Sequence, residues 1–236
     1  MGGRADGARG DRLGAARARA AARRGGGVTA AGRGLTSAWA GLPGGTVVDE
    51  RTVDGLGVLT TSVLDLDGDV PTLHAWCTAR GTEFWGLGHL TTDELRETYA
   101  FVDGLEHHHA LLSRVDGVPV ALVQVYEPAH DPVGEVYDVQ PGDLGVHVLV
   151  GARPPGRERG FSQRLLLALV RVAAETTGAT RIVGEPDARN TAMLRRAEQL
   201  GAVLGPEVEL PTKRARLTFL EVASAVGRRG VPAQSR

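Results

Sequence analysis

The stretch that decides the fold is Gly142–Gly151, with the sequence GDLGVHVLVG. Its run of apolar residues is typical of a strand buried inside a sheet, although a histidine stands at its centre. The segment Arg157–Ser162 (RERGFS) follows, and residues 161–177 then carry apolar side chains at helical spacing. A second apolar strand, Thr180–Gly184, ends at the acidic segment Glu185–Asp187. Because a strand–helix–strand unit of this kind is parallel and right-handed, this region predicts the centre of a mixed sheet.

The sequence on either side of this unit supplies the rest of the sheet. Turn residues such as Asp116-Gly117 separate segments of β-branched or alternating character. We expect strands at residues 46–53, 56–65, 110–115, 118–127, 203–210 and 215–222. We expect helices at residues 91–102 and 190–200, and a helical region that starts near residue 73. The prediction is a mixed α/β fold, a central twisted sheet of about seven strands with helices on both faces.

Composition divides the chain into one folded domain and two tails. Residues 1–40 are rich in Gly, Ala and Arg, and have too few large apolar side chains to offset the entropy cost of ordering. We predict that they form a disordered tail; a basic arm for an anionic partner is the alternative. Folded sequence begins near Leu42, so the predicted domain spans residues 41–224. Residues 225–236 are expected to form a flexible tail.

Composition also excludes several classes of protein. The net charge of −1 gives no bulk attraction to nucleic acid. Cys77 is the only cysteine, which rules out an intrachain disulfide and a thiolate metal cluster and favours a reducing, cytoplasmic location. No apolar run approaches the roughly 20 residues that span a bilayer. Arg interrupts each alanine run near the N-terminus, so we expect neither a membrane segment nor an export signal.

Polar side chains stand at the ends of the two central strands. A lone histidine in an apolar strand, such as His147, is commonly a core residue whose hydrogen bonds are satisfied. Because the carboxyl ends of adjacent parallel strands lie together, however, we expect His147 to meet Glu185 and Asp187. A carboxylate beside apolar walls should have a raised pKa, which suits a general base. The alternative is a solvated turn before the helix at Asn190, which fits Asp187 better than Glu185; no ligand spacing supports a metal here.

The segment Arg157–Ser162 has the features of an anion site. Free backbone N–H groups at a helix start and the helix dipole both favour negative charge. Gly160 allows close approach of a phosphate, and Arg157 and Arg159 add positive charge. A pyrophosphate is the expected ligand, and an ordinary basic loop is the alternative. The Gly-Lys-Ser/Thr of a P-loop is absent from the sequence.

The sequence leaves the role of two further clusters of residues undecided. The run His107-His108-His109 invites a metal site, but we interpret it as a histidine cluster at the surface or at the start of a hairpin, and expect no metal. The aromatic residues Trp76, Phe84 and Trp85 could wall a pocket or pack the core.

Gln124 and Tyr126 share one face of their strand because strand side chains repeat every two residues.

Taken together, these segments resemble a known family. The strand, basic glycine turn and helix are similar to the acyl-coenzyme A site of GCN5-related N-acyltransferases. The likeness is strongest to the siderophore-biosynthesis branch, with its lysine N-acyltransferases of the mycobactin pathway and hydroxylysine acetyltransferases of the aerobactin pathway. It extends over about residues 72–222 and rests on Gln124–Tyr126, Tyr137–His147, Arg159–Phe161, Glu185–Asn190 and Leu210–Leu217.

The resemblance implies direct acyl transfer from acyl-CoA, with acetyl-CoA the expected donor, or from an acyl carrier protein. The acceptor would be the amine or N-hydroxyamine of a lysine- or cadaverine-type siderophore precursor. By this resemblance Glu185 is the proton acceptor, His147 contacts the substrate, and Asp187 is the second candidate base. Glu185 stands where some relatives have Asp, which lengthens the side chain by one methylene.

The expected site has a donor half and an acceptor half. Pantetheine would lie between strands 144–150 and 180–184, with a backbone N–H polarising the thioester carbonyl. The donor half is expected to use Val148, Leu149, Val150, Arg157, Arg159, Gly160, Phe161, Ser162 and Asn190. The acceptor half is expected to use His147, Gln124, Tyr126, Trp85 and Tyr137. Tyr126 or Tyr137 would protonate the leaving thiol, or the sulfur would leave as thiolate.

Two other functions stay open on the sequence. An aminoglycoside N-acetyltransferase would need an acidic cleft, for which Glu83, Asp93 and Glu94 are available. A non-catalytic acyl-CoA-binding module would keep the basic turn and not need Glu185. We expect a monomer or a homodimer.

Overall fold

The computed structural model describes residues 34–151 and 160–227. In these residues, eight strands form one sheet in the order β1-β2-β3-β4-β5-β6-β8-β7. Their bounds are β1 (Val47–Val53), β2 (Gly57–Val63), β3 (His108–Val115), β4 (Val118–Tyr126), β5 (Asp143–Val150), β6 (Arg181–Gly184), β7 (Val203–Leu210) and β8 (Lys213–Glu221). Neighbouring strands are antiparallel, except that β5 and β6 are parallel.

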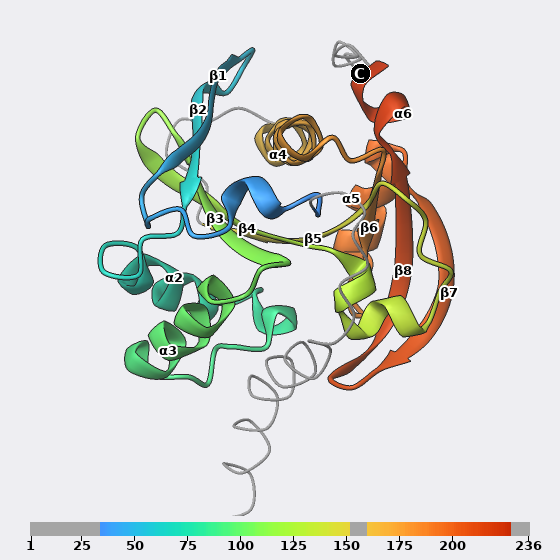
Figure 1. Ribbon diagram of the computed structural model, residues 1–236, viewed down its shortest axis with the longest axis horizontal. Coiled ribbons are helices and arrows are strands. Elements are labelled where there is room, and N and C mark those ends of the chain that lie inside the picture. Colours follow the sequence, from blue (N-terminus) through green and yellow to red (C-terminus); the bar gives the residue numbers. More distant parts are fainter. Residues whose placement is uncertain (1–33, 152–159, 228–236) are drawn as a thin grey trace, which may run out of the picture.

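Helices cover both faces of the sheet (Figure 1). Their bounds are α2 (Val70–Cys77), α3 (Thr92–Asp103), α4 (Phe161–Thr177), α5 (Thr191–Leu200) and α6 (Val222–Gly227). Four 3-10 turns are η1 (Ser37–Trp39), η2 (Glu83–Trp85), η3 (Pro128–His130) and η4 (Pro132–Glu135). The side chains of β4 alternate between two cores: Ala121 and Val123 pack on the α4 side, and Leu122 packs with α2 and α3.

The predicted fold class is confirmed. The sheet has eight strands in the described part of the chain, where about seven were expected. The hairpin of β1 and β2 pairs with β3 and so extends the same sheet, because Leu59–Val63 run alongside Leu111–Val115.

The folded region begins before Leu42. Thr36 is 0% exposed and Trp39 is 4% exposed, so both are buried although they fall within the expected tail. The Trp39 ring packs edge-on against His109, with centroids 6.1 Å apart. One buried tryptophan is enough to fix this short segment, because an aromatic ring removes a large apolar area from water. Ala225, in the expected C-terminal tail, is also buried. Residues 1–33 and 228–236 of the two expected tails lie outside the described residues.

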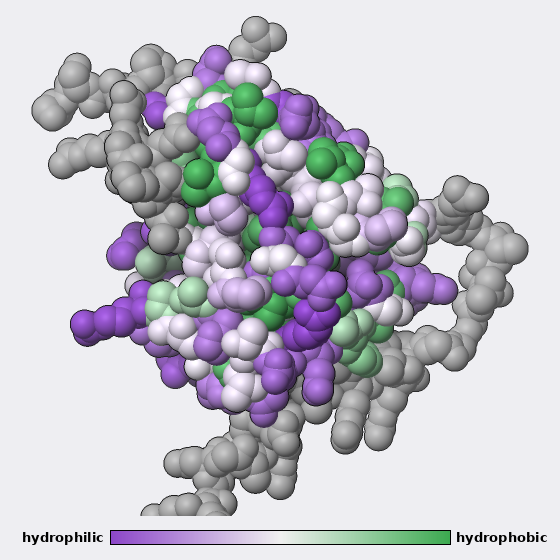
Figure 2. Space-filling view, turned by 90° about the vertical axis from the view of Figure 1, so that its left-hand side faces the viewer, coloured by the Kyte–Doolittle hydropathy of each residue, from purple (hydrophilic) through white to green (hydrophobic). Residues whose placement is uncertain are grey.

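On the surface, hydrophobic and hydrophilic groups are interspersed over the face shown in Figure 2. The most exposed of the large apolar side chains in the described residues are Val203 and Val47, at 69% and 55%. Among the helices that the structure describes, none is long and apolar enough to cross a bilayer.

The two parallel strands diverge soon after they meet. β5 and β6 pair only through Asp143–Gly145 and Arg181–Val183. The pairing is anchored by Arg181, whose Nε and guanidinium nitrogen donate to the two oxygens of Asp143 at 2.6 and 2.8 Å. Beyond Gly145, β5 continues to Val150 while β6 ends at Gly184, so the sheet opens between them.

Candidate active site

A cleft of about 480 Å³ occupies the opening between β5 and β6. Its walls are Val146–Val150 of β5, Leu166 and Val170 of α4, and the segment Gly184–Asp187 that follows β6. The three expected donor residues Val148, Leu149 and Val150 all line it. Gly151 N–H donates to the carbonyl of Val120 on β4, and strand alternation then directs the N–H groups of Val148 and Val150 away from β4, toward the cleft.

Glu185 is the centre of a buried polar cluster at the inner end of the cleft. It is 4% exposed, and three side chains contact its carboxylate. The Tyr126 hydroxyl donates to Oε2 at 2.7 Å, and the Lys213 ammonium donates to Oε1 at 3.2 Å. The Nε2 atom of His147 forms a short hydrogen bond to the same Oε1. The sequence-based prediction that His147 meets Glu185 agrees with this geometry.

The prediction of a raised pKa for Glu185 is wrong. Burial does act to raise it, but the charges of His147 and Lys213, together with hydrogen bonds from His147 and Tyr126, outweigh burial. They hold the pKa of Glu185 well below its usual range. A carboxylate that is ionised and so fully engaged is a weak base at neutral pH.

The β4–β5 register builds this cluster. Gln124 pairs with His147, and Tyr126 pairs with Gly145. A Cβ atom on Gly145 would lie 2.1 Å from the Tyr126 ring, so glycine is required for that ring to cross the strand and reach Glu185. β8 runs antiparallel to β6 and brings its first residue, Lys213, to the other side of the carboxylate.

Several side chains contact the imidazole of His147. Nε2 forms its hydrogen bond to the ionised Glu185 and therefore carries a proton. Nδ1 lies 3.3 Å from the side-chain oxygen Oε1 of Gln124, which can accept from Nδ1 only when that nitrogen is protonated as well. The Trp85 ring stands edge-on to the imidazole, with centroids 6.4 Å apart.

A second, narrower pocket of about 80 Å³ adjoins the cleft on the side of α3. Phe101, Val102 and Leu105 supply apolar wall, while Gln124 and Asp131 supply polar groups. Four residues line both this pocket and the cleft: Trp85, His147, Glu185 and Lys213. The Glu185 cluster therefore stands where two cavities meet.

The carboxylate of Asp187 is hydrogen-bonded to Arg189. Its carboxylate accepts from the backbone N–H of Arg189 at 2.9 Å and from the Arg189 guanidinium at 2.8 and 2.7 Å. The side-chain hydrogen bonds of Arg189 lower the pKa of Asp187 more than burial raises it. Asp187 lines the cleft, but these bonds make it part of the turn before α5, whose first turn is capped by the Asn190 side chain on Met193 N–H. Asn190 itself lines the cleft as expected.

Tyr137 is not part of either cavity as the structure describes them. Its hydroxyl donates to Asp143 at 3.0 Å, and its ring packs edge-on against Phe219. The loop turns its ring toward a small core with Leu217, and a role of Tyr137 in substrate binding stays a prediction. Tyr126 also lines neither described cavity, and contacts the site through Glu185.

The anion site expected before α4 is only partly described. Gly160, with a positive φ of 87°, precedes the first turn of α4. Phe161 is 2% exposed and packs in the core, so only its backbone is available to a ligand. Gly160, Phe161 and Ser162 are not among the described lining residues of the cleft. Arg157 and Arg159 lie outside the described residues.

Two groups of site residues were not assigned from the sequence. Lys213 could have been singled out from the sequence, because it is the only lysine of the chain. On α5 the cleft is lined by Met193, Arg196, Ala197 and Leu200, whose spacing marks one face of a helix. That spacing identifies an exposed helical face but does not reveal the cavity that it covers.

Comparison with known proteins adds sequence relatives. The chain is 32% identical over 82 residues to the N-hydroxyputrescine acetyltransferase of Acinetobacter baumannii, covering 35% of this chain and 38% of that protein. It is 33% identical over 112 residues to lysine N-acyltransferase MbtK of Mycobacterium tuberculosis, covering 47% and 53%. It is 30% identical over 123 residues to the N(6)-hydroxylysine O-acetyltransferase of Escherichia coli, covering 49% and 37%. The chain thus spans about half the length of these relatives or less.

Solved structures support the fold. An uncharacterized protein from Bacillus halodurans has a TM-score of 0.70 and 24% identity, over 78% of this chain and 94% of that one. Aminoglycoside acetyltransferase AAC(6')-Ib in complex with coenzyme A has a TM-score of 0.61 and 20% identity, over 73% and 99%. Residues 65–210, which are more than half of the chain and hold both walls of the cleft, match the acetyltransferase (GNAT) domain family. The chain therefore belongs to the acetyltransferase (GNAT) domain family, as the resemblance in its sequence predicted.

Proposed function

We propose that this protein transfers an acyl group from an acyl thioester to the amine or N-hydroxyamine of a short aliphatic molecule. The observation that carries the proposal is the Glu185–His147 pair, which lies where the larger cleft and the narrower pocket meet. Relatives named for acetyl or acyl transfer to N-hydroxyputrescine, lysine and N(6)-hydroxylysine support this class of acceptor.

The cleft suits the thioester arm of the donor. Its volume of about 480 Å³ is in the range of small-molecule sites. The N–H groups of Val148 and Val150 would stabilise the oxyanion that forms as the amine attacks the carbonyl. We propose acetyl-CoA as donor, with its pyrophosphate at the start of α4 and at Arg157 and Arg159. A phosphopantetheine arm on a carrier protein would enter by the same opening.

His147 is the better proton acceptor. The low pKa of Glu185 makes that carboxylate a poor base, and the imidazole bonded to it is the neighbouring group that can accept the proton instead. Nδ1 of His147 takes the proton of the attacking nitrogen, and Glu185 holds the ring by its Nε2–H and balances the imidazolium charge. This revises the sequence-based expectation in which Glu185 took the proton directly.

The bonds exchanged are one C–N formed and one C–S broken. The thiolate is a good leaving group because its conjugate thiol has a pKa of about 8.5. The imidazolium of His147 can return its proton to that thiolate. The hydroxyls of Tyr126 and Tyr137 are poor donors to the sulfur, since burial and neighbouring carboxylates raise the pKa of both.

The narrower pocket selects a slim acceptor. About 80 Å³ with apolar walls from α3 suits an unbranched alkyl chain. Lys213 places a fixed positive charge beside the reaction centre, which disfavours a protonated amine there. An N-hydroxyamine is less basic than an amine, because the oxygen withdraws electrons, and so enters uncharged.

An aminoglycoside acceptor is less well supported. Such a polycation needs a wide acidic cleft, and two of the three acids proposed for it already accept hydrogen bonds within the chain. Glu94 closes the capping box of α3 with Thr91, and Glu83 accepts from the N–H of Gly81 at 2.9 Å. The likeness to AAC(6')-Ib, at 20% identity, supports the fold and not the substrate.

The test is product analysis by mass spectrometry. Purified protein would be incubated with a panel of diamines, N-hydroxydiamines and aminoglycosides, each with acetyl-, succinyl- and long-chain acyl-CoA. We expect a hydroxamate or amide of a short diamine, lost in Glu185→Gln and retained in Asp187→Asn. Acylated aminoglycoside as the main product would contradict the proposed acceptor. CoA binding without any product, in wild type and with carrier-protein donors, would indicate a binding module.

A further inference from the structure

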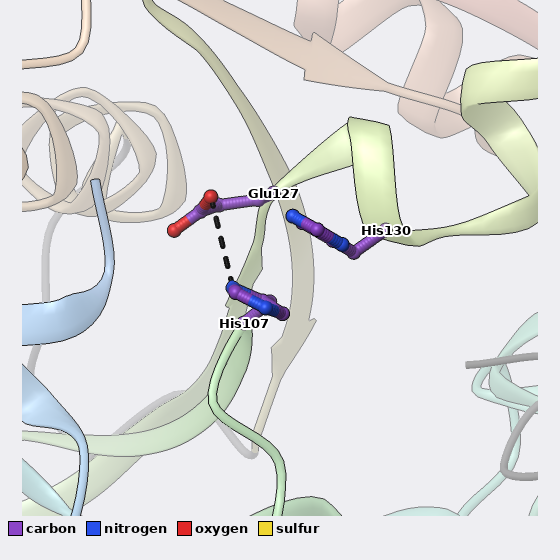
Figure 3. A group of neighbouring side chains, drawn as sticks. All are labelled: His107, Glu127 and His130. Atoms are coloured by element: carbon purple, nitrogen blue, oxygen red, sulfur yellow. Dashed lines mark ion pairs between the residues drawn. The ribbon is translucent and has the colours of Figure 1, made fainter. Parts of the chain in front are cut away.

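A second cluster of polar side chains lies apart from the cleft, where β3 begins and β4 ends (Figure 3). It consists of His107, Glu127 and His130, and the possible ligand atoms all lie within 4.8 Å of one another. Nδ1 of His107 is 3.8 Å from Oε2 of Glu127. The rings of His107 and His130 are stacked, with centroids 3.7 Å apart and planes at 7°. We propose that these three side chains form a site for a divalent transition-metal ion, with Zn²⁺ the best match.

The strand pairing positions two of the ligands. Glu127 N–H donates to the carbonyl of His107 at 3.0 Å, which extends the β3–β4 ladder by one step. The neighbouring pair of the ladder is His108 and Tyr126, which pack together on the side of the Glu185 cluster. Because side chains alternate, His107 and Glu127 lie on the opposite face of the sheet. The proposed metal site is therefore distinct from the active site, although it lies on the same two strands.

The third ligand is positioned by a proline turn. Glu127 precedes Pro128 and has extended backbone angles, as residues before proline prefer. His130 N–H then donates to the carbonyl of Glu127 at 2.9 Å and closes η3. This turn brings the His130 ring over that of His107.

Hydrogen bonds from Thr36 fix the orientation of the Glu127 carboxylate. Its Oε1 accepts from the backbone N–H and the hydroxyl of Thr36, at 3.1 and 3.0 Å. Oε2 faces His107 instead. On the far side of that ring, Nε2 lies 4.0 Å from the carboxylate of Glu106. Outer groups that fix ligand orientation in this way are typical of metal sites.

The ligand set determines the kind of ion. Two imidazoles and one carboxylate suit Zn²⁺ and related transition ions, whereas Ca²⁺ and Mg²⁺ prefer oxygen ligands alone. Ligands bonded to Zn²⁺ at about 2.0–2.2 Å lie about 3.3–3.5 Å from one another. The separations here, up to 4.8 Å, must shorten when the ion binds. An ion lies in the plane of each ring that binds it, so the stacked rings would tilt apart on loading.

The expected role is structural. The ion would tie η3 to the start of β3, and through Glu127 it would hold the segment at Thr36 against the sheet. This differs from the expectation of no metal at the run His107–His109. Only His107 of that run takes part, and its partners are distant in sequence.

The test uses untagged, chelator-treated protein titrated with Zn²⁺ and, for its visible absorption, with Co²⁺. We expect one equivalent of Zn²⁺ to bind and to raise the unfolding temperature, because a ligand that binds only the folded state stabilises it. Co²⁺ should give d–d bands from nitrogen and oxygen ligands. The variants His107→Gln, His130→Gln and Glu127→Gln should each weaken binding by more than about tenfold.

A matched control is His89→Gln, which replaces an exposed histidine outside the cluster and should leave binding unchanged. Glu127→Gln keeps an oxygen for the bonds from Thr36, so it separates loss of the ligand from loss of the fold. Equal Zn²⁺ affinity in wild type and in the three ligand variants would overturn the proposal. So would the absence of stoichiometric binding by the wild type.

Discussion

The ammonium of Lys213 lies 3.2 Å from Oε1 of Glu185; the Glu185 side chain is buried, at 5% exposure, and that of Lys213 is partly buried, at 13%. The chain has no other lysine, whereas arginine is used freely elsewhere. An ammonium is a compact point charge, and the wider guanidinium fork of arginine has a different shape and donor geometry. At this one position the site therefore calls for lysine rather than for positive charge in general.

Replacing Lys213 by Met should lower kcat/KM by about tenfold or more, because Glu185 loses one of the charges that keep it ionised. The pKa of Glu185 should rise, which moves the acidic limb of the pH–rate profile to higher pH. Lys213→Arg keeps the charge and should restore little activity if the compact shape matters. The measurement is kcat/KM against pH for the three proteins. An Arg variant with wild-type activity would limit the role of Lys213 to its charge.

The two tyrosines near the site form a matched pair. Tyr126→Phe removes a hydrogen bond to a buried carboxylate and should cost about 2 kcal/mol of unfolding free energy, with a clear loss of activity. Tyr137→Phe removes the bond to Asp143, which keeps its two bonds from Arg181, and should cost about 1 kcal/mol. Its KM and kcat should remain within about twofold of wild type. Urea denaturation and steady-state kinetics measure both effects, and a raised KM in Tyr137→Phe would return that residue to the substrate site.

Stability should fall in acid partly through Glu185. Its pKa is lower in the folded protein than in the unfolded chain, where it is about 4.3. The carboxylate therefore stabilises the fold fully above that pH, and the contribution is lost as pH falls through the folded-state pKa. At pH 7 Glu185→Gln should be less stable by about 3 kcal/mol, since it leaves buried partners uncompensated. Denaturation should show the same difference at pH 7 and pH 5 and a smaller one at pH 3.5, where Glu185 of the unfolded chain is largely protonated; an unchanged difference at pH 3.5 would mean that the pKa of Glu185 is not lowered by folding.

Gly145→Ala should displace Tyr126 from Glu185. The new Cβ would lie 2.1 Å from the ring, and relieving such overlap costs about 1–3 kcal/mol. Activity should fall with stability because the Glu185 cluster loses a donor. Gly104→Ala is the control, since its Cβ would meet nothing closer than 3.5 Å. Full activity in Gly145→Ala would show that the Tyr126 hydroxyl is dispensable.

The central unit could be predicted because its signals are local. The expected helix at 161–177 agrees with α4 (Phe161–Thr177), and the expected strand at 203–210 agrees with β7. Apolar periodicity and glycine stops lie within each segment, so no distant contact is needed to recognise them. His147 and Glu185 were also predictable, because parallel strands bring their carboxyl ends together.

The electrostatic state of the site could not be predicted in the same way. Glu185 is 28 residues from Lys213 and 59 from Tyr126, and these contacts depend on the insertion of β8 between β6 and β7 and on the β4–β5 register. The sequence shows apolar walls, which raise a pKa, but not which donors reach the carboxylate. The direction of the Tyr137 side chain could not be predicted for a related reason, since a loop residue has no periodicity that fixes its direction.

The opening between β5 and β6 has a kinetic consequence. The cleft and the narrower pocket share His147 and Glu185. With the proposed donor in the cleft and the proposed acceptor in the pocket, both would reach the same atoms at the same time, and neither product would have to leave before the second substrate enters. The only cysteine, Cys77, packs in the α2–α3 core, and burial raises the pKa of its thiol to about 11, so it is a poor acyl carrier. Initial-velocity plots should therefore intersect, as in a ternary-complex mechanism, rather than run parallel as in ping-pong turnover.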